Sequence, residues 1–256
     1  MQSTNRMESR VGKTIVITGA GGGLGRAIAR RFAADGEAVV LLGRTLSKVQ
    51  RVAEEIGDNA LAVGCDVSQP ESVREAFARV AERHERIDVL INNAAVYEPF
   101  LIAEARDEQI LESIAINVAG PILCARAAIP LIRRGGHLIN VSSESVSLTW
   151  PFLALYQTTK AAVERFSQAL AHELEPNGIS VTNVRAGQMM DEDSSNNWDP
   201  EIRQRFGMAA MQAGLNLRER PISHFNSVTD VFRAIIDLPA DLQIAAVNLA
   251  ARKRDA

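Results

Sequence analysis

The chain has 256 residues, of which 46% are hydrophobic, and its formal net charge at pH 7 is -3. This length and composition allow one large core, whereas the small negative charge, spread along the chain, gives no sign of a nucleic-acid surface. Four histidines without ligand spacing predict no metal site, and two cysteines in apolar segments, Cys65 and Cys124, favour reduced thiols over a disulfide framework.

Residues 1–10 are polar and lack the apolar stretch of a signal peptide. No apolar run of membrane-spanning length is expected elsewhere. We therefore predict a disordered leader over 1–10, a single domain over 11–256, no contact with a membrane and a cytoplasmic location.

From Lys13 onward, short apolar runs alternate with segments of helical periodicity. The runs are apolar on both faces and predict buried parallel strands at 14–17, 38–42, 60–63, 89–91, 138–141, 181–184 and 245–249. Helices are predicted at 24–34, 46–56, 71–84, 109–132 and 153–174. The alternation predicts an α/β doubly wound parallel sheet, Rossmann-like, of about seven strands with helices on both faces. The long insertion 188–227 predicts a lid.

The turn between the first strand and its helix reads Thr18-Gly19-Ala20-Gly21-Gly22-Gly23-Leu24-Gly25. Glycines allow a sharp turn and let the backbone approach a pyrophosphate at the helix N-terminus. In this position between strand and helix, the turn predicts dinucleotide binding. The chain lacks the G-x-x-x-x-G-K-[ST] pattern of a mononucleotide P-loop.

Gly43 and Arg44 follow the second predicted strand. A carboxylate in this place binds the 2′-hydroxyl of NAD, whereas a 2′-phosphate needs a cation. Arg44 therefore predicts that NADP(H) is preferred over NAD(H), with a solvated surface arginine as the alternative.

Tyr156 and Lys160 are four residues apart in a predicted helix and lie on one face of it. An ammonium group this close is expected to lower the pKa of the phenol from about 10 and to make Tyr156 a proton donor. Ser143, which follows the strand 138–141, could polarise a carbonyl held between the two. Such a pair also occurs by chance, so its weight comes from the other motifs.

These motifs, in this order, resemble the short-chain dehydrogenase/reductase family, in its single-domain branch of about this length, from Lys13 to Leu249. The resemblance assigns the acidic residue near the adenine to Asp66 and the active-site asparagine to Asn117. A serine-to-tyrosine spacing of thirteen selects Ser143 rather than Ser142. The implied catalytic residues are Asn117, Ser143, Tyr156 and Lys160.

The implied cofactor-binding residues are Thr18, Gly19, Gly21, Gly22, Gly23, Leu24, Gly25, Arg44, Asp66, Val67, Asn93, Ala94, Ala95, Tyr156, Lys160, Ala186, Gly187, Met189 and Asp191. The chain departs from the family pattern at three of them. Ala95 replaces a glycine and crowds the floor of the nicotinamide site by one methyl group. Ala186 replaces a proline and loosens a turn, and Asp191 replaces a threonine and adds negative charge near the ring.

The resemblance implies reversible hydride transfer between NADP(H) and a carbonyl or secondary alcohol. Tyr156 would protonate the carbonyl oxygen and Ser143 would hydrogen-bond it. Lys160 would hold the nicotinamide ribose and tune Tyr156, and Asn117 would anchor a water that links Lys160 to solvent. An epimerase or dehydratase that uses the same pair, and a non-catalytic NADP(H)-binding sensor or scaffold, are the alternatives.

Two expectations about partners follow. Family members commonly pair the helices that correspond to 109–132 and 153–174, so we expect a homo-oligomer, either a dimer or a tetramer. The small-molecule substrate is set by the lid, where no motif identifies it. The lid's apolar side chains could line a substrate pocket or pack within the lid; they are Met189, Met190, Trp198, Phe206, Met208 and Met211.

Overall fold

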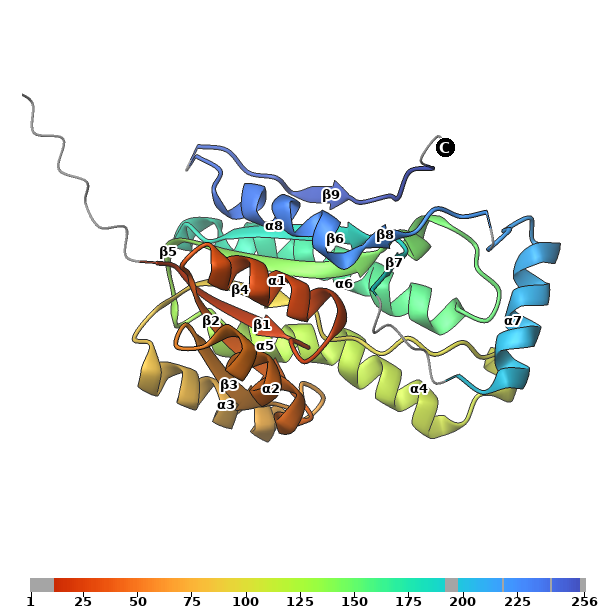
Figure 1. Ribbon diagram of the computed structural model, residues 1–256, viewed down its shortest axis with the longest axis horizontal. Coiled ribbons are helices and arrows are strands. Elements are labelled where there is room, and N and C mark those ends of the chain that lie inside the picture. The colour runs from red at the N-terminus through yellow and green to blue at the C-terminus, as the bar shows by residue number, and fades with distance from the viewer. Residues whose placement is uncertain (1–11, 192–197, 218, 240, 254–256) are drawn as a thin grey trace, which may run out of the picture.

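A twisted parallel sheet runs through the middle of the protein, with helices on both of its faces (Figure 1). The computed structural model describes residues 12–191, 198–217, 219–239 and 241–253, so the predicted leader at 1–10 lies outside the described residues. The strands of the sheet are β1 (Thr14–Thr18), β2 (Ala38–Gly43), β3 (Ala60–Gly64), β4 (Ile87–Asn92), β5 (Ile132–Ser143), β6 (Ser180–Ala186) and β9 (Ala246–Asn248). Their order is β3-β2-β1-β4-β5-β6-β9, and neighbouring strands are parallel. This confirms the predicted fold class.

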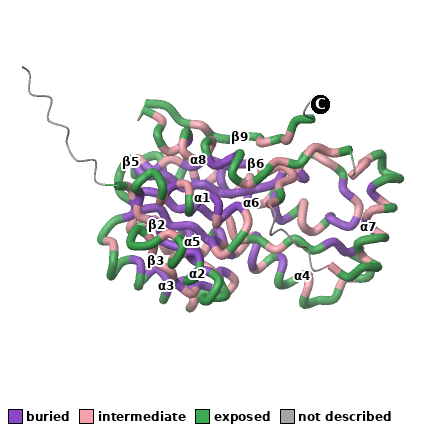
Figure 2. The backbone as a smooth tube through the Cα atoms, in the orientation of Figure 1, coloured by how far each residue is buried: buried purple, intermediate pink, exposed green. Residues whose placement is uncertain are grey.

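Alternate residues of each strand point to opposite faces of the sheet. The helices are α1 (Gly23–Ala34), α2 (Leu46–Ile56), α3 (Pro70–Arg83), α4 (Asp107–Ile114), α5 (Gly120–Ala128), α6 (Ala154–Leu174), α7 (Pro200–Gln212) and α8 (Thr229–Ile236). On β1, Ile15 and Ile17 belong to the core under α1, α2 and α8, whereas Val16 belongs to the core under α3, α5 and α6. All three are fully buried, and Figure 2 shows the central strands in the colour of buried residues.

The prediction of one continuous helix over 109–132 is wrong in two respects. The segment is interrupted, and its helical part ends before residue 132. Helix α4 ends at Ile114, the residues Ala115–Ala119 form a π-helical turn, and α5 ends at Ala128. Pro130 lies just beyond this end, and a proline disfavours helical backbone in the residue before it and lacks the N–H that a helix needs. Ile132 already belongs to β5, and residues 133–136 bulge out of the ladder between β5 and β4.

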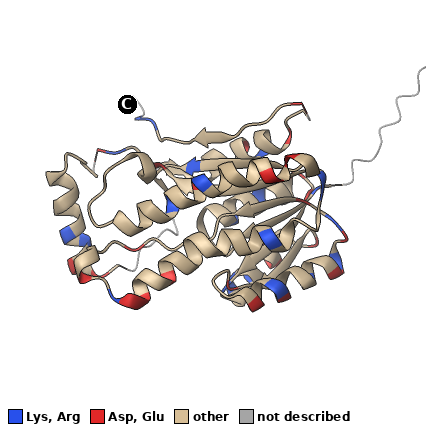
Figure 3. Cartoon of the chain, turned by 180° about the vertical axis from the view of Figure 1, so that it is seen from behind, with Lys and Arg blue, Asp and Glu red and all other residues tan. Residues whose placement is uncertain are grey.

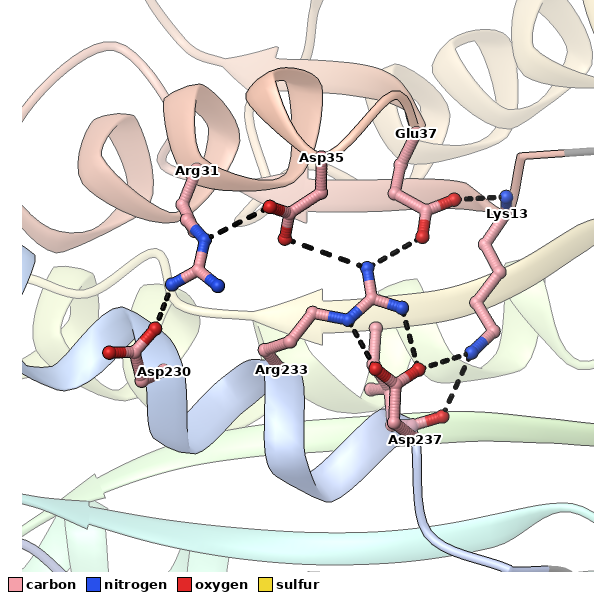
Figure 4. A network of polar contacts seen from close by, with 8 residues as sticks. Lys13, Arg31, Asp35, Glu37, Asp230, Arg233 and Asp237 are labelled. Atoms are coloured by element: carbon pink, nitrogen blue, oxygen red, sulfur yellow. Dashed lines mark hydrogen bonds and ion pairs between the residues drawn. The ribbon is translucent and has the colours of Figure 1, made fainter.

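An ion-pair network joins α8 to the N-terminal ends of β1 and β2 (Figure 4). Arg233 lies 2.6 Å from Glu37 Oε1 and 2.5 Å from Asp237 Oδ2, and Lys13 Nζ lies 2.8 Å from Asp237 Oδ1. The hydrogen bond from Arg233 holds the pKa of Asp237 well below its usual range. A network of several charges holds its geometry better than an isolated surface pair. It fixes α8, and with it the preceding turn η5 (Phe225–Val228), which reaches the candidate site.

The described parts of the segment 188–227 lie over one end of the sheet (Figure 1). The short strands β7 (Met189–Met190) and β8 (Ser223–His224) pair in parallel, and α7 lies between them in sequence. Phe206 and Ala210 of α7 are buried against Trp150 and Phe152, which belong to the connection between β5 and α6. Hydrophobic packing therefore holds α7 over this connection.

Candidate active site

The C-terminal ends of β1, β4 and β5 meet the N-termini of α1 and α6 at one edge of the sheet. The chain runs from β1 outward to β3 and then returns to the other side of β1 with β4. At such a switch point, the loops after two neighbouring strands run in opposite directions. A crevice forms between these loops. A cavity of about 910 Å³ lies here, and Asn93, Ala95, Ser143, Tyr156 and Lys160 are among the residues that line it.

Thr18 and two glycines close the turn between β1 and α1. Thr18 is buried, and its Oγ1 accepts hydrogen bonds from the backbone N–H groups of Asn93 and Ala94, both at 3.0 Å. Gly19 has a φ of 68°, which favours glycine, and a Cβ added to Gly25 would lie 2.5 Å from the carbonyl oxygen of Gly19. Contacts among these five residues of the predicted cofactor set therefore fix the turn against the loop after β4, where Asn93 lines the cavity.

The first turn of α1 presents backbone N–H groups to the crevice. Gly22 is the N-cap, no side chain of the described residues caps the turn, and a Cβ added to Gly22 would meet no atom within 4 Å. Gly23 has a φ of 50°, and Gly21 lies so close to α2 that a Cβ would reach 3.0 Å from Lys48 Cβ. Open amide groups at a helix N-terminus favour an anion. The turn therefore fits the pyrophosphate of a dinucleotide, with Leu24 beside it in the cavity wall.

Arg44 follows β2, and 63% of its side chain is exposed. Its Nη1 lies 3.1 Å from Glu112 Oε1 of α4, and 54% of the Glu112 side chain is exposed. Exposed ion pairs contribute little to stability, so the guanidinium can exchange Glu112 for another anion. At Gly43, an added Cβ would lie 2.8 Å from Val49 Cγ1, which explains why glycine rather than a carboxylate ends this strand.

Asp66 and Val67 lie in the connection between β3 and α3. Asp66 Oδ1 accepts hydrogen bonds from the backbone N–H of Ser68 at 3.0 Å and from its hydroxyl at 2.6 Å. Val67 is buried and packs on Gly120 of α5, where an added Cβ would lie 2.9 Å from Val67 Cγ2. The carboxylate thus orders its own turn.

Asn117 occupies the π-helical turn between α4 and α5 and is 1% exposed. Its Oδ1 accepts from the backbone N–H of Val96 at 2.8 Å, and its Nδ2 donates to the Val96 carbonyl at 2.9 Å and to Thr159 Oγ1 at 3.2 Å. The side chain therefore ties the loop after β4 to the N-terminal part of the helix that carries Tyr156. The role of Asn117 as a water anchor stays a prediction.

The cavity is lined together by Ser143, Tyr156 and Lys160. Lys160 Nζ lies 5.9 Å from the centroid of the Tyr156 ring and donates a hydrogen bond to the Val141 carbonyl at 2.9 Å. Ser143 Oγ accepts from the backbone N–H of Ser145 at 3.2 Å and is hydrogen-bonded to Tyr156. The strand β5 and the helix α6 thus bring together three of the four predicted catalytic residues.

Burial controls the protonation of this pair. Burial raises the pKa of Tyr156, against the hydrogen bond with Ser143, which lowers it. Burial also lowers the pKa of Lys160 to about 8. The prediction that Lys160 lowers the pKa of Tyr156 is wrong in this structure, because the ammonium group donates to Val141 and loss of hydration acts on the phenol more strongly. The phenol is therefore protonated at neutral pH and can donate its proton.

Asp191 is paired with a residue of α1. Its Oδ2 lies 2.9 Å from Arg26 Nη2, and the side chains are 14% and 18% exposed, respectively. This ion pair balances the negative charge that the sequence was expected to place near the nicotinamide. The cavity is also lined by three predicted cofactor-binding residues that precede Asp191, namely Ala186, Gly187 and Met189.

Aromatic side chains form the cavity wall beside Tyr156. The ring of Tyr97 meets that of Tyr156 edge-on, with centroids 4.8 Å apart, and Trp198 lies 5.1 Å from Tyr97. Phe206 lies 5.6 Å from Trp198 and packs on Trp150 at 6.1 Å. The wall therefore joins the loop after β4, the connection before α6 and the helix α7.

The sequence identified some of the residues that line the cavity. Four of the six apolar residues noted in the lid line the cavity, namely Met189, Met190, Trp198 and Phe206. Met208 and Met211 are exposed instead. Tyr97, Glu144 and Trp150 were missed as lining residues. Their signal was their place in the sequence, close after Ala95 or between Ser143 and Tyr156.

Known proteins resemble this chain in sequence and in fold. A family model described as short chain dehydrogenase matches residues 13–201. The meso-2,3-butanediol dehydrogenase of Serratia marcescens is 34% identical over 197 residues, which cover 76% of this chain and 78% of that protein. A 3-ketoacyl-(acyl-carrier-protein) reductase from Brucella melitensis, solved with NADH, has a TM-score of 0.78 at 28% identity and covers 93% of this chain and 96% of its own. A short chain dehydrogenase from Burkholderia cenocepacia, solved with NADP, has a TM-score of 0.80 at 25% identity, with 94% and 98% covered.

Proposed function

Because this chain belongs to the short-chain dehydrogenase family, we propose that it transfers a hydride reversibly between NADP(H) and a ketone or secondary alcohol. The protein is an oxidoreductase that uses a nicotinamide cofactor. The observation that carries the proposal is the placement of Tyr156 with Ser143 and Lys160 in a cavity that adjoins the glycine-rich turn. Two relatives support the substrate class, since one is named for a secondary alcohol and the other for a ketone. Oxidation of NADPH in the presence of a panel of ketones tests it.

Each residue of the site has a role in this proposal. The bound nicotinamide supplies the hydride chemistry. Tyr156 donates its proton to the carbonyl oxygen and Ser143 hydrogen-bonds the same oxygen. Lys160 holds the ribose, and Asn117 positions the loop after β4 and anchors a water. The first turn of α1 holds the pyrophosphate.

We expect Arg44→Ala to raise the KM for NADPH far more than the KM for NADH. Loss of a charge-assisted contact to the 2′-phosphate costs on the order of 1.5–3 kcal/mol, roughly tenfold to over a hundredfold. Steady-state kinetics with both cofactors measures the effect. Glu112→Gln is the matched control, because it frees Arg44 from its ion pair and should leave the KM for NADPH unchanged or lower. Equal KM values for the two cofactors in the native protein would refute the preference.

Helices α4 and α5 expose an apolar stripe that a soluble monomer would leave in water. Leu111 is 66% exposed, Ile114 42% and Ile122 41%, and Figure 3 shows little charge along the middle of this helix pair. By length and composition alone, Asp107–Ala128 is the one helical segment among the described residues that could cross a membrane. About a third of the most apolar part of this segment is buried inside the protein. We propose that a second copy of the chain covers this stripe, together with the outer face of α6.

A homo-oligomer, either a dimer or a tetramer, is therefore expected in solution. Sedimentation at micromolar concentration should show a species at least twice as heavy as the 27.8 kDa chain. Leu111→Glu combined with Ile122→Glu should reduce its mass, because charges would be buried without partners at the interface. Met211→Glu, on the exposed side of α7, is the control that should keep the native mass. A native protein that sediments only at 27.8 kDa would exclude this assembly.

The remaining expectations belong to the same proposal. We propose that residues 11–256 form one domain in which 188–227 cover the substrate. Cys65 and Cys124 are free and buried, which supports a reducing compartment such as the cytoplasm. The negative charge of Asp191 was one reason to consider a non-catalytic sensor. Arg26 balances this charge, so the pairing weakens that alternative. An epimerase or dehydratase would give no net oxidation of NADPH in the ketone panel.

A further inference from the structure

Two large aromatic side chains beside Tyr156 keep part of their surface accessible. Tyr97, in the loop after β4, is 43% exposed, and its ring makes an angle of 72° with the Tyr156 ring. Trp198 is half-buried and its ring is tilted by 49° from that of Tyr97. Both line the cavity. Aromatic surface in this arrangement can pack against the ring of another molecule, either stacked or edge-on.

This aromatic wall is held rigidly from behind. Trp198 Nε1 donates to the backbone carbonyl of Tyr97 at 3.3 Å, and Phe206 supports Trp198 edge-on at 85°. Phe206 is 5% exposed and stacks on Trp150 at an interplanar angle of 24°. The loop that carries Tyr97 is fixed through the hydrogen bonds of Asn117 to the preceding residue. A preformed wall loses little conformational freedom when a ligand binds.

The charged side chains around the cavity already have contacts with the protein. Glu144 Oε1 lies 2.5 Å from Arg220 Nη2, and Lys160 Nζ donates to the Val141 carbonyl at 2.9 Å. Arg203 donates to a backbone carbonyl of the aromatic wall at 3.4 Å. A charged substrate would have to displace one of these contacts or enter without a partner, and burial of an unpaired charge is costly. The part of the cavity beside the aromatic wall therefore favours an uncharged substrate.

We propose that the substrate is an uncharged ketone or secondary alcohol with an aromatic ring next to the reacting carbon, and that Tyr97 and Trp198 bind this ring. The inference rests on the proposed function and names the substrate class of the same site. The cavity volume of about 910 Å³ gives room for such a ring beside a nicotinamide. A small aliphatic ketone would leave the accessible surface of both rings uncovered, so it would gain little from the wall.

Competition between two ketones of similar size tests the inference by turnover. Acetophenone and cyclohexyl methyl ketone differ in whether the six-membered ring is aromatic. The ratio of their kcat/KM values is expected to fall about tenfold in Trp198→Leu and in Tyr97→Leu, the scale of one or two aromatic contacts. Because each ratio is compared with the native one, the intrinsic reactivity of the ketones cancels. Tyr97→Phe keeps the ring and should retain the native ratio, as should Met208→Leu on the exposed side of α7.

Binding of carboxamides tests the same inference without turnover. Benzamide and cyclohexanecarboxamide resemble the two ketones but are not reduced, and calorimetric titration in the presence of NADPH measures their affinities. Benzamide is expected to bind about tenfold more tightly, and Trp198→Leu should remove the difference. Equal affinities for the two amides, or an unchanged ketone ratio in the leucine variants, would overturn the inference even if ketones are reduced. A benzamide preference without reduction of any ketone would support the aromatic site and overturn the proposed function instead. Faster reduction of 4-acetylbenzoate than of its methyl ester would overturn the claim that the substrate is uncharged.

Discussion

Tyr156→Phe is expected to lower the turnover of every accepted carbonyl substrate by at least about a hundredfold, the usual scale for a positioned general acid. The substitution removes one hydroxyl group and keeps the ring that packs on Tyr97. Burial raises the pKa of Tyr156, so the phenol holds its proton at neutral pH and is ready to donate it. Because the pyrophosphate turn lies on another element, NADPH binding and the fold should be nearly unchanged.

Fluorescence titration with NADPH, together with single-turnover kinetics, separates binding from chemistry in this variant. Thr158→Ala is the matched control, since it removes a hydroxyl from the exposed side of the same helix. Its turnover should equal that of the native protein. Full activity in Tyr156→Phe would exclude the proposed acid. Tight NADPH binding by a native protein that reduces no ketone would favour the sensor alternative.

The sheet could be predicted from the sequence because the pattern that specifies it is local. A strand covered by helices on both faces needs apolar residues at consecutive positions, and Ile15, Val16 and Ile17 show this directly. The helix over 46–56 begins and ends where α2 does. The error at 109–132 arose because two local effects compete. The helical periodicity of apolar residues continues through Pro130, but a proline cannot continue the helix itself.

The residues of the candidate site differ in how far the sequence could reveal them. Ser143, Tyr156 and Lys160 have fixed spacings on elements that the fold brings together, so a pattern can find them. The pairing of Arg26 with Asp191 joins residues 165 positions apart, which no spacing predicts. The aromatic wall likewise depends on where α7 packs. The sign of the Tyr156 pKa shift was wrong because helical spacing specifies the distance to Lys160 but not the loss of hydration.

Lys160→Met is expected to abolish most activity and to remove a pH dependence from the stability of the protein. Lys160 is 4% exposed, and burial lowers its pKa from 10.5 to about 8. Below pH 8 the amine is charged in both the folded and unfolded states, so the folded state carries the full cost of the buried charge, on the order of 3 kcal/mol. Between pH 8 and 10.5 the folded state releases the proton while the unfolded state keeps it, so the contribution of Lys160 to stability rises with pH.

Methionine has a straight side chain of similar length and carries no charge, so it can fill the site without this cost. Loss of the hydrogen bond to the Val141 carbonyl offsets part of the gain, by about 1–3 kcal/mol. We therefore expect Lys160→Met to be at least as stable as the native protein at neutral pH, with a flatter profile from pH 8 to 10.5. NADPH affinity should fall, because Lys160 is proposed to hold the nicotinamide ribose, and turnover should fall with it by about a hundredfold, the scale of a misplaced reactant. Urea unfolding across this pH range, with Lys48→Met on the exposed side of α2 as control, measures the difference. Parallel profiles for the native protein and Lys160→Met would mean that the buried ammonium does not cause the pH dependence.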